Sequence, residues 1–93
     1  MIKSFKSKET EKVHQGRYSK RIPQDIQRLA ARKLEMLAAA NELRSLRIPS
    51  SNHLEKLQGD RAGQHSLRIN DQWRICFIWK DGNAHEVEIA DYH

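Results

Sequence analysis

The sequence predicts an α+β domain in which a small antiparallel sheet is covered on one face by N-terminal helices. Three observations lead to this prediction. The chain has 93 residues, which is enough for about one domain. The first half spaces its apolar residues as a helix does, and the second half alternates apolar and polar residues between short turns. We therefore expect residues 1–93 to form a single domain.

The N-terminal half holds the predicted helices. Residues 1–6 alternate in a way that allows a short edge strand, and residues 8–15 are typical of a polar helical turn that ends at Gly16. Pro23 suits the first turn of the next helix, because its missing N–H costs nothing there. One stripe of that helix is apolar: Ile26, Leu29, Ala30, Leu34, Leu37 and Ala40. Lys33 falls inside the stripe, and we expect its stem to lie along the core edge with the ammonium in water.

The chain between the helix and the sheet is expected to be irregular. Three apolar residues extend the packing before residues 49–52 break the chain: Leu43, Leu46 and Ile48. After this break we expect a loop that runs to residue 63.

The C-terminal third predicts a three-strand meander. Strands of alternating character cover residues 64–69 and 73–80, and a last strand finishes with residues 91–93. Hairpin turns are predicted at residues 70–71 and 81–83. One row of the middle strand would lie under the helix: Trp73, Ile75, Phe77 and Trp79. The other face is expected to stay open. It carries Arg68 and Arg74 on adjacent strands, a candidate cradle for a phosphate backbone.

The charge distribution indicates an anionic partner. Seventeen Lys and Arg face twelve Asp and Glu, and residues 1–33 hold ten of the basic residues but three of the acidic ones. Nucleic acid is the first candidate for such a partner. No run of about 18 apolar residues predicts a membrane span. A lone Cys76 and no apolar leader after Met1 predict a cytoplasmic protein.

Most strong chemical motifs are absent from the sequence, including nucleotide-binding glycine loops, zinc-finger spacings and nucleophile elbows. His65 and His85 share the parity of core residues, so we expect both to be packed, and Cys76 is expected to be an inert thiol. Arg61 and Arg68 can be explained as ion-pair partners of nearby acids. Those acids would be Asp60 and Glu86.

The last three residues are either a frayed chain end or a chemical site held against the sheet, because they continue the last strand. Asp91 and His93 fall on one side of the predicted strand, so Asp91 can orient the imidazole and favour its charged form. His93 could then act as a general acid or base, and Tyr92 could stack on a base or donate its O–H. A metal site would need ligands at odd separations on one strand, which point to opposite faces, so it is disfavoured. Its members would be His85, Glu88, Asp91 and His93.

Residues 57–77 resemble the HigB toxins, plasmid-maintenance killer proteins of the RelE/ParE superfamily. They read LQGDRAGQHSLRINDQWRICF, and residues 2–5 and 91–93 extend the resemblance over nearly the whole chain. The resemblance implies a RelE-like fold and a type II toxin–antitoxin pair with a cognate antitoxin as partner. It also implies a ribosome-dependent mRNA interferase, an endoribonuclease that cleaves message in the A site.

The resemblance also implies a set of site residues. Four are expected to be catalytic: Arg74, Asp91, Tyr92 and His93. Four are expected to bind RNA: Arg68, Arg61, Lys56 and His53. Some family members carry a catalytic histidine at the position of Glu55, and His53 lies two residues away. Because the RNA 2′-OH is the nucleophile, neither a metal nor another cofactor is expected.

Two other functions fit parts of the sequence. A ParE-like toxin would share the fold but poison DNA gyrase without RNA chemistry, and residues 91–93 argue against it. A non-catalytic RNA-binding module would use only the basic surface. Loss of toxicity through a single His93 substitution that preserves folding and binding would argue against that module.

Overall fold

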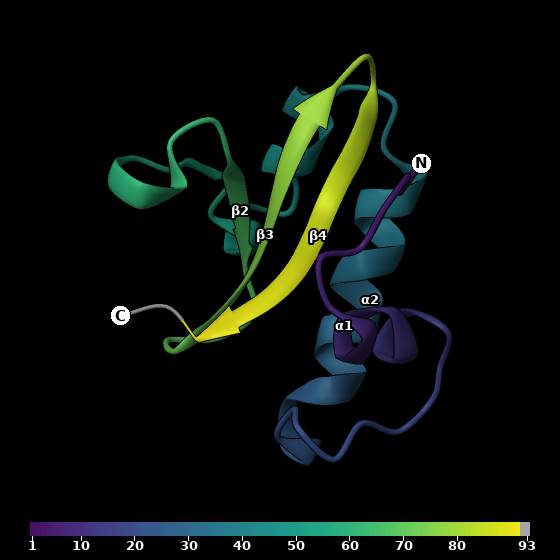
Figure 1. Ribbon diagram of the computed structural model, residues 1–93. Helices are drawn as coiled ribbons and strands as arrows, with labels where there is room; N and C mark the ends of the chain where they lie inside the picture. The colour runs from purple at the N-terminus through teal and green to yellow at the C-terminus, as the bar shows by residue number, and fades with distance from the viewer. Residues whose placement is uncertain (92–93) are drawn as a thin grey trace.

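Two helices pack against one face of a four-stranded antiparallel sheet in the computed structural model, which describes residues 1–91 (Figure 1). The α+β prediction is confirmed, but the sheet has four strands instead of the predicted three, because residues 55–56 of the predicted loop pair with β2. The helices are α1 (Lys8–His14) and α2 (Gln24–Ala39), followed by the short 3-10 helices η1 (Leu43–Arg47), η2 (Ser50–Asn52) and η3 (Gly59–Arg61). The strands, in sheet order, are β1 (Glu55–Lys56), β2 (His65–Arg68), β3 (Trp73–Lys80) and β4 (Asn83–Asp91).

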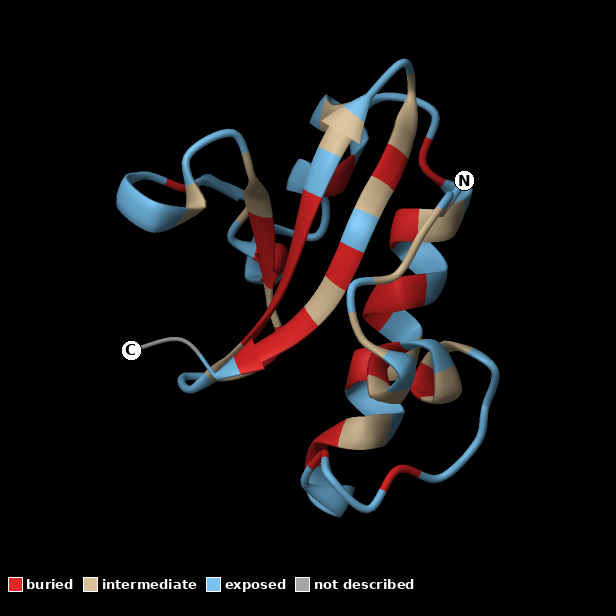
Figure 2. Ribbon diagram, in the orientation of Figure 1, coloured by how far each residue is buried: buried red, intermediate tan, exposed pale blue. Residues whose placement is uncertain are grey.

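The main core lies between α2 and the sheet. Ile75 and Phe77 of β3 and Val87 of β4 are fully buried there against Leu34 and Leu37 of α2 (Figure 2). The predicted apolar row of β3 is therefore confirmed in its centre, while its two tryptophans are partly buried at the ends. Among residues 1–91, no helix is long and apolar enough to cross a membrane.

The N-terminal segment runs parallel to β4 without forming a regular strand. It makes two isolated bridges, Ile2 to Ala84 and Phe5 to Val87. The backbone N–H of Lys3 donates to the carbonyl of Ala84 at 2.8 Å, which holds the segment on the sheet edge. The predicted edge position is confirmed, but the predicted strand is replaced by these two bridges.

The buried stripe of α2 differs from the predicted one. Leu29 is 39% exposed, whereas Lys33 is only 5% exposed. The expectation that the Lys33 ammonium reaches water is wrong, because the chain after α2 folds back and covers it with Asn52. Ile48 was also expected to pack, but it lies on the outer side of this returning chain and is 80% exposed.

A β-bulge in β4 changes which residues face the helices. The pairing of β3 with β4 shifts between Cys76 and Ile78, and Glu86 takes a left-handed backbone conformation with φ 52°. The extra residue moves His85 opposite Ile78, on the face away from the helices. The prediction that His85 shares the core parity is therefore wrong, because alternation along a strand cannot reveal a bulge.

Candidate functional site

The sheet face opposite the helices was expected to be open, but its centre is covered. Ser66 and Cys76 have no exposed surface, and Leu57 forms a small apolar cluster there with Cys76 and Ala90. The cover is the segment that carries β1 and η3, whose Leu57 N–H donates to the carbonyl of Gln64 at 2.9 Å. We call this covered surface the polar face. It is the face on which Arg74 lies.

Arg74 is the most constrained charged residue of the polar face. It is 9% exposed. Its Nε donates to Ser66 Oγ at 2.6 Å and its Nη2 donates to the His53 carbonyl at 2.6 Å. The Glu55 carboxylate lies 3.9 Å from the same Nη2. Since a guanidinium has five N–H donors, these neutral acceptors orient the group without using all its donors. The result is a cation held in one position beside an acid.

Glu55 and His53 reach Arg74 in different ways. His53 has a left-handed backbone, φ 42°, and offers its carbonyl rather than its ring. The side chain of His53 makes no hydrogen bond or ion pair within residues 1–91. Glu55 instead brings a titratable carboxylate to the guanidinium. At the position where some family members carry histidine, the structure therefore places an acid–base group of another type.

A buried polar network anchors the loop that carries His53. Lys33 Nζ donates to Asn52 Oδ1, and Asn52 Nδ2 donates to the carbonyls of Leu46 at 3.0 Å and Ile48 at 3.4 Å. Asn52 is fully buried. Burial lowers the pKa of Lys33, with a smaller contribution from the nearby charge of Arg68. The sequence signal for this anchor was the lysine inside an apolar stripe, which we had assigned to the surface.

The other arginines of the predicted RNA-binding set are ion-paired. Arg68 lies opposite Arg74 in the β2–β3 register, and its Nη2 pairs with Asp71. Arg61 Nη1 lies 3.2 Å from both Glu88 Oε1 and Gln64 Oε1. The expectation of ion pairs is confirmed, but Asp60 and Glu86 are the wrong partners. The observed partners, Glu88 and Asp71, are the acids that the folded chain brings close to the two arginines.

The structure separates two predicted site residues from Arg74. Lys56 pairs with His65, which is opposite the core residue Phe77, so Lys56 lies on the helix-covered side of β1. Asp91 pairs with Trp73, whereas Arg74 pairs with Ala90. Asp91 therefore sits on the neighbouring pleat, where its Oδ2 accepts from Gln72 Nε2 at 3.0 Å. Tyr92 and His93 lie outside the described residues.

Two buried groups behave as the sequence predicts. Burial raises the pKa of the Cys76 thiol, so the thiol stays protonated and unreactive at neutral pH. His65 packs on Phe77 with ring centroids 6.2 Å apart. Burial also lowers the pKa of His65, followed by the charge of Lys56. No group of three His, Cys, Asp or Glu suited to a metal ion occurs within residues 1–91.

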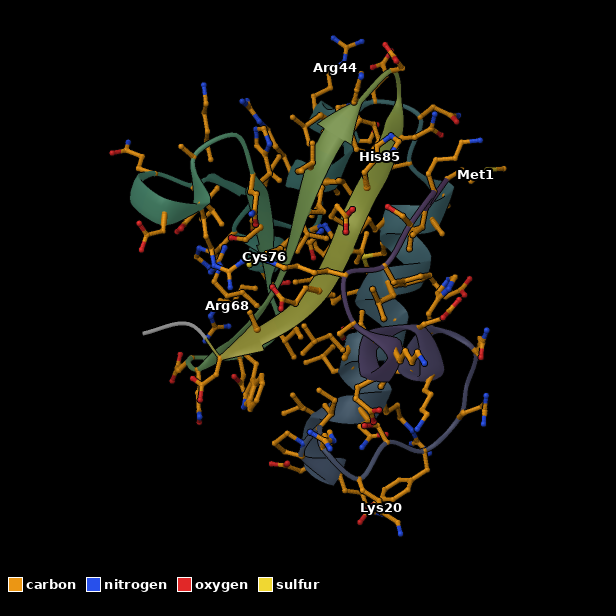
Figure 3. The ribbon with its side chains drawn as sticks, viewed as in Figure 1. Met1, Lys20, Arg44, Arg68, Cys76 and His85 are labelled. Atoms are coloured by element: carbon orange, nitrogen blue, oxygen red, sulfur yellow. The ribbon has the colours of Figure 1, made fainter. Side chains whose placement is uncertain are left out.

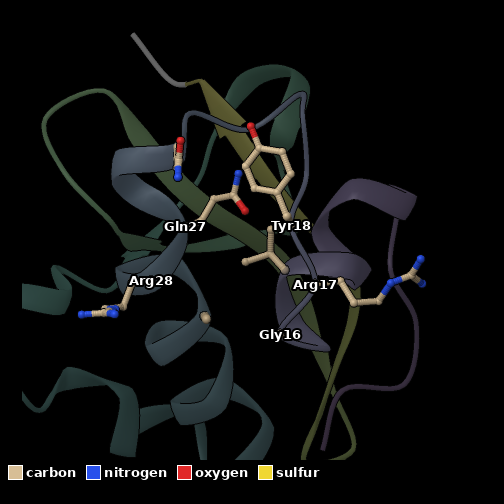
Figure 4. A pocket seen from close by; sticks show the side chains of 8 residues that line it. Gly16, Arg17, Tyr18, Gln27 and Arg28 are labelled. Atoms are coloured by element: carbon tan, nitrogen blue, oxygen red, sulfur yellow. The ribbon is translucent and has the colours of Figure 1, made fainter.

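Side chains on the surface show how the charged groups are distributed. Arg44 and Lys20 lie at opposite ends of the molecule, and Arg68 lies beside the sheet (Figure 3). A hollow of about 420 Å³ opens between α1, residues 16–18 and α2 (Figure 4). Tyr18, Gln27 and Arg28 are among its lining residues, and none of the predicted site residues that lie within residues 1–91 lines it.

Comparison with known proteins gives consistent results. Residues 3–93 match the family described as the RelE-like toxin of the type II toxin–antitoxin system HigB. "Toxin HigB-1" of Vibrio cholerae is 41% identical over 85 residues, which is 90% of each chain. "Endoribonuclease HigB" of Proteus vulgaris is 34% identical over 94 residues and is matched over its full length and that of this chain.

A solved structure shares the fold at low sequence identity. A chain of the heterotetrameric YoeB–YefM toxin–antitoxin complex from Staphylococcus aureus superposes with a TM-score of 0.56 at 18% identity. The match covers all of this chain and 98% of that one. The architecture described above is thus a RelE-type toxin fold, as the resemblance implied. Together with the match over residues 3–93, this shows that the chain belongs to the HigB family of RelE-like toxins of type II toxin–antitoxin systems.

Proposed function

We propose that this toxin is a metal-independent endoribonuclease that cleaves messenger RNA in the ribosomal A site and is neutralised by a cognate antitoxin. The observation that carries the proposal is the pairing of Arg74 with Glu55 on the polar face. Arg74 is held by Ser66 and His53, and an acid–base group lies 3.9 Å from it. The Proteus vulgaris relative named an endoribonuclease supports the same activity.

The proposed reaction uses the RNA as its own nucleophile. Glu55 takes the proton of the 2′-OH, the 2′-oxygen forms a bond to phosphorus, and the bond from phosphorus to the 5′-oxygen breaks. The products are a 2′,3′-cyclic phosphate and a 5′-hydroxyl. Arg74 stabilises the negative charge that develops on the phosphorane oxygens, and its fixed position avoids reorganisation during the reaction.

The remaining roles follow the family resemblance. His93 protonates the leaving 5′-oxygen, Asp91 orients His93, and Tyr92 stacks on a base of the message. Arg61 and Arg68 contact flanking phosphates after exchanging their acidic partners for RNA. Their ion pairs are partly exposed, and exposed pairs contribute only about 0–1 kcal/mol, so this exchange costs little.

In the proposed reaction, the ribosome positions the message. The polar face offers one acid–base residue beside Arg74 within residues 1–91, and a flexible message must be held in line for attack. Naked RNA should therefore be cut slowly. Message on translating ribosomes should be cut near the A site.

The decisive experiment compares wild type with Glu55→Gln on programmed ribosomes, with RNA ends read by sequencing. Glu55→Gln should lower the cleavage rate about 10²- to 10⁴-fold, because the amide cannot accept the proton. Exposed Asp60→Asn in the same segment, which removes the same charge, is the matched control and should cut normally. A 2′-deoxy nucleotide at the scissile position should block cutting completely.

Three outcomes would contradict the proposal. A deoxy-substituted message cut at the same bond would require water as nucleophile. Equal cutting of free and ribosome-bound RNA would remove the role of the ribosome. Inhibition of gyrase supercoiling by the purified protein, with no RNA cleavage, would replace the proposed activity with ParE-like poisoning.

A further inference from the structure

A second basic hollow lies at the β1 edge of the sheet. It has a volume of about 420 Å³. Its lining comes from η1, from the chain around β1 and from β2: Leu43, Arg44, Arg47, Leu54, Lys56 and His65. Nothing in the proposed reaction uses this hollow. We call it the edge pocket.

The edge pocket and the Arg74 site lie on opposite sides of the same short strand. Glu55 and Lys56 are consecutive residues of β1, so their side chains point to opposite faces. Glu55 points toward Arg74, whereas Lys56 pairs with His65 on the side that faces the core. Because β1 is the edge strand of the sheet, only its width separates the two sites.

The charges of the edge pocket are poorly neutralised. Arg47 and Lys56 make no ion pair within residues 1–91. Arg44 pairs with Glu42 at 2.6 Å, but both side chains are mostly exposed, so the pair is weak. Among residues 1–91, no carboxylate lines the pocket. An anion that enters it therefore meets unpaired cations.

The walls of the edge pocket are not purely polar. Leu43 and Leu54 are partly buried and pack against the main core, and they present apolar surface between the cations. His65 completes the lining with a ring packed on Phe77, and its Nδ1 is buried without a hydrogen-bond partner. Proteins bind single-stranded nucleic acid with a positive groove that follows its backbone and with aromatic rings that stack on its bases. The edge pocket offers the cations and the His65 ring, and Leu43 and Leu54 add apolar surface.

We infer that the edge pocket binds a flanking nucleotide of the RNA whose scissile phosphate lies at Arg74, with the strand crossing the sheet edge at β1. The phosphate of this nucleotide contacts Arg47 and Lys56, and its base lies against Leu43 and Leu54. The inference rests on the proposed function, since it assumes RNA at Arg74. It gives Lys56 an RNA-binding role even though Lys56 lies on the face away from Arg74.

The test is an NMR titration of the labelled full chain with 2′-O-methyl RNA, which cannot attack its own phosphate. A dinucleotide is long enough to occupy only one of the two sites, whereas a pentanucleotide can cross the sheet edge at β1 and occupy both. Wild type should bind the pentanucleotide about tenfold more tightly than the dinucleotide, as expected for one added charge-assisted contact. Arg47→Glu should abolish that gain. Lys20→Glu, an equal charge change at the other end of the molecule, should keep it.

Arg47 is exposed, so its substitution should leave the thermal unfolding midpoint unchanged, and Arg47→Lys should restore most of the gain. In wild type, resonances of His65 and Lys56 should shift with the pentanucleotide and not with the dinucleotide. The inference is overturned if Arg47→Glu keeps the full gain, or if inorganic phosphate alone shifts these resonances as far as RNA does. It is also overturned if Arg47→Glu weakens only antitoxin binding, since the pocket would then serve the protein partner.

These outcomes can be separated from failure of the proposed function. If wild-type protein cuts message on ribosomes but shows no Arg47-dependent gain in affinity for the longer RNA, only the edge-pocket inference is wrong. If the protein cuts no message under any condition, the proposed function is wrong, whatever the titration shows.

Discussion

The two faces of the sheet are equally buried at their centres but are built from different chemistry. On the helix side, Ile75 and Phe77 pack against the leucines of α2. On the polar face, Ser66 and Arg74 are buried as a hydrogen-bonded pair, and Cys76 packs beside them. Alternate residues of the same strands supply both surfaces. The helix side supplies stability, whereas the polar face holds a cation in place.

The difference is also one of energy. Burying a large apolar side chain contributes about 1.5–3 kcal/mol, and it does so in any well-packed orientation. Burying a guanidinium is unfavourable unless it is hydrogen-bonded or paired, and Arg74 meets this condition in part, through Ser66, the His53 carbonyl and the nearby Glu55. Substitutions on the two faces should therefore separate stability from activity.

Phe77→Ala should have the largest effect on folding. Phe77 is fully buried in the main core, so the cavity should cost about 3–5 kcal/mol in the free energy of unfolding. Urea denaturation measures it. Ile78→Ala is the matched control on the same strand, and its half-exposed side chain faces the other way. If both variants lose the same stability, the helix side is not the stabilising face.

Arg74→Lys should affect activity most among changes on the polar face. Lysine keeps the charge but loses the planar fork that contacts Ser66 and His53, so single-turnover cleavage on ribosomes should fall about 10²- to 10³-fold. Arg32→Lys on the exposed side of α2 should cut at the normal rate. Unfolding measured in parallel separates lost chemistry from lost folding. Normal cleavage by Arg74→Lys would remove the distinction between the faces.

Asn52→Ala should weaken the anchor behind the polar face. It leaves the Lys33 ammonium and the Leu46 carbonyl buried without their partner, which should cost about 2–3 kcal/mol. Amide hydrogen exchange in residues 50–56 should rise more than in β3. Ser51→Ala, one residue earlier and exposed, should change neither measurement. Uniform exchange across the chain in Asn52→Ala would show that the network stabilises the whole fold and not this loop.

His65 should produce the smallest effect, as a pH dependence of stability. Burial lowers the pKa of His65 below its ordinary value of 6.5, so the unfolded chain takes up the proton first. The contribution of neutral His65 to the free energy of unfolding is fully present above pH 6.5. It should decrease as the pH drops from 6.5 toward the lowered pKa. His65→Phe should flatten this acid limb in urea titrations. His85→Phe, on the polar-face side of the sheet, should keep the loss of stability at acid pH. If His85→Phe removes this loss and His65→Phe does not, His85 is the group responsible.

The candidate site was predictable in part. The Arg74 position followed from the resemblance to HigB toxins and from the alternation of β3, and the structure places it on the predicted face. The sequence could not decide whether Glu55 or His53 brings its side chain to Arg74, because this depends on the left-handed turn at His53 that sends its carbonyl to Arg74. The burial of Lys33 was missed for a similar reason. Its partner Asn52 lies nineteen residues away in the chain.

The sequence by itself determined the two helices, the β2–β4 meander, the apolar row of β3 and the family, because periodicity and local motifs are properties of neighbouring residues, but it did not reveal the two-residue strand β1. The tertiary structure alone decided what covers each face, which acid pairs with each arginine and where the bulge turns His85 outward. Periodicity tells which residues share a side of an element. Which distant segment lies against that side depends on the free energy of packing the whole chain.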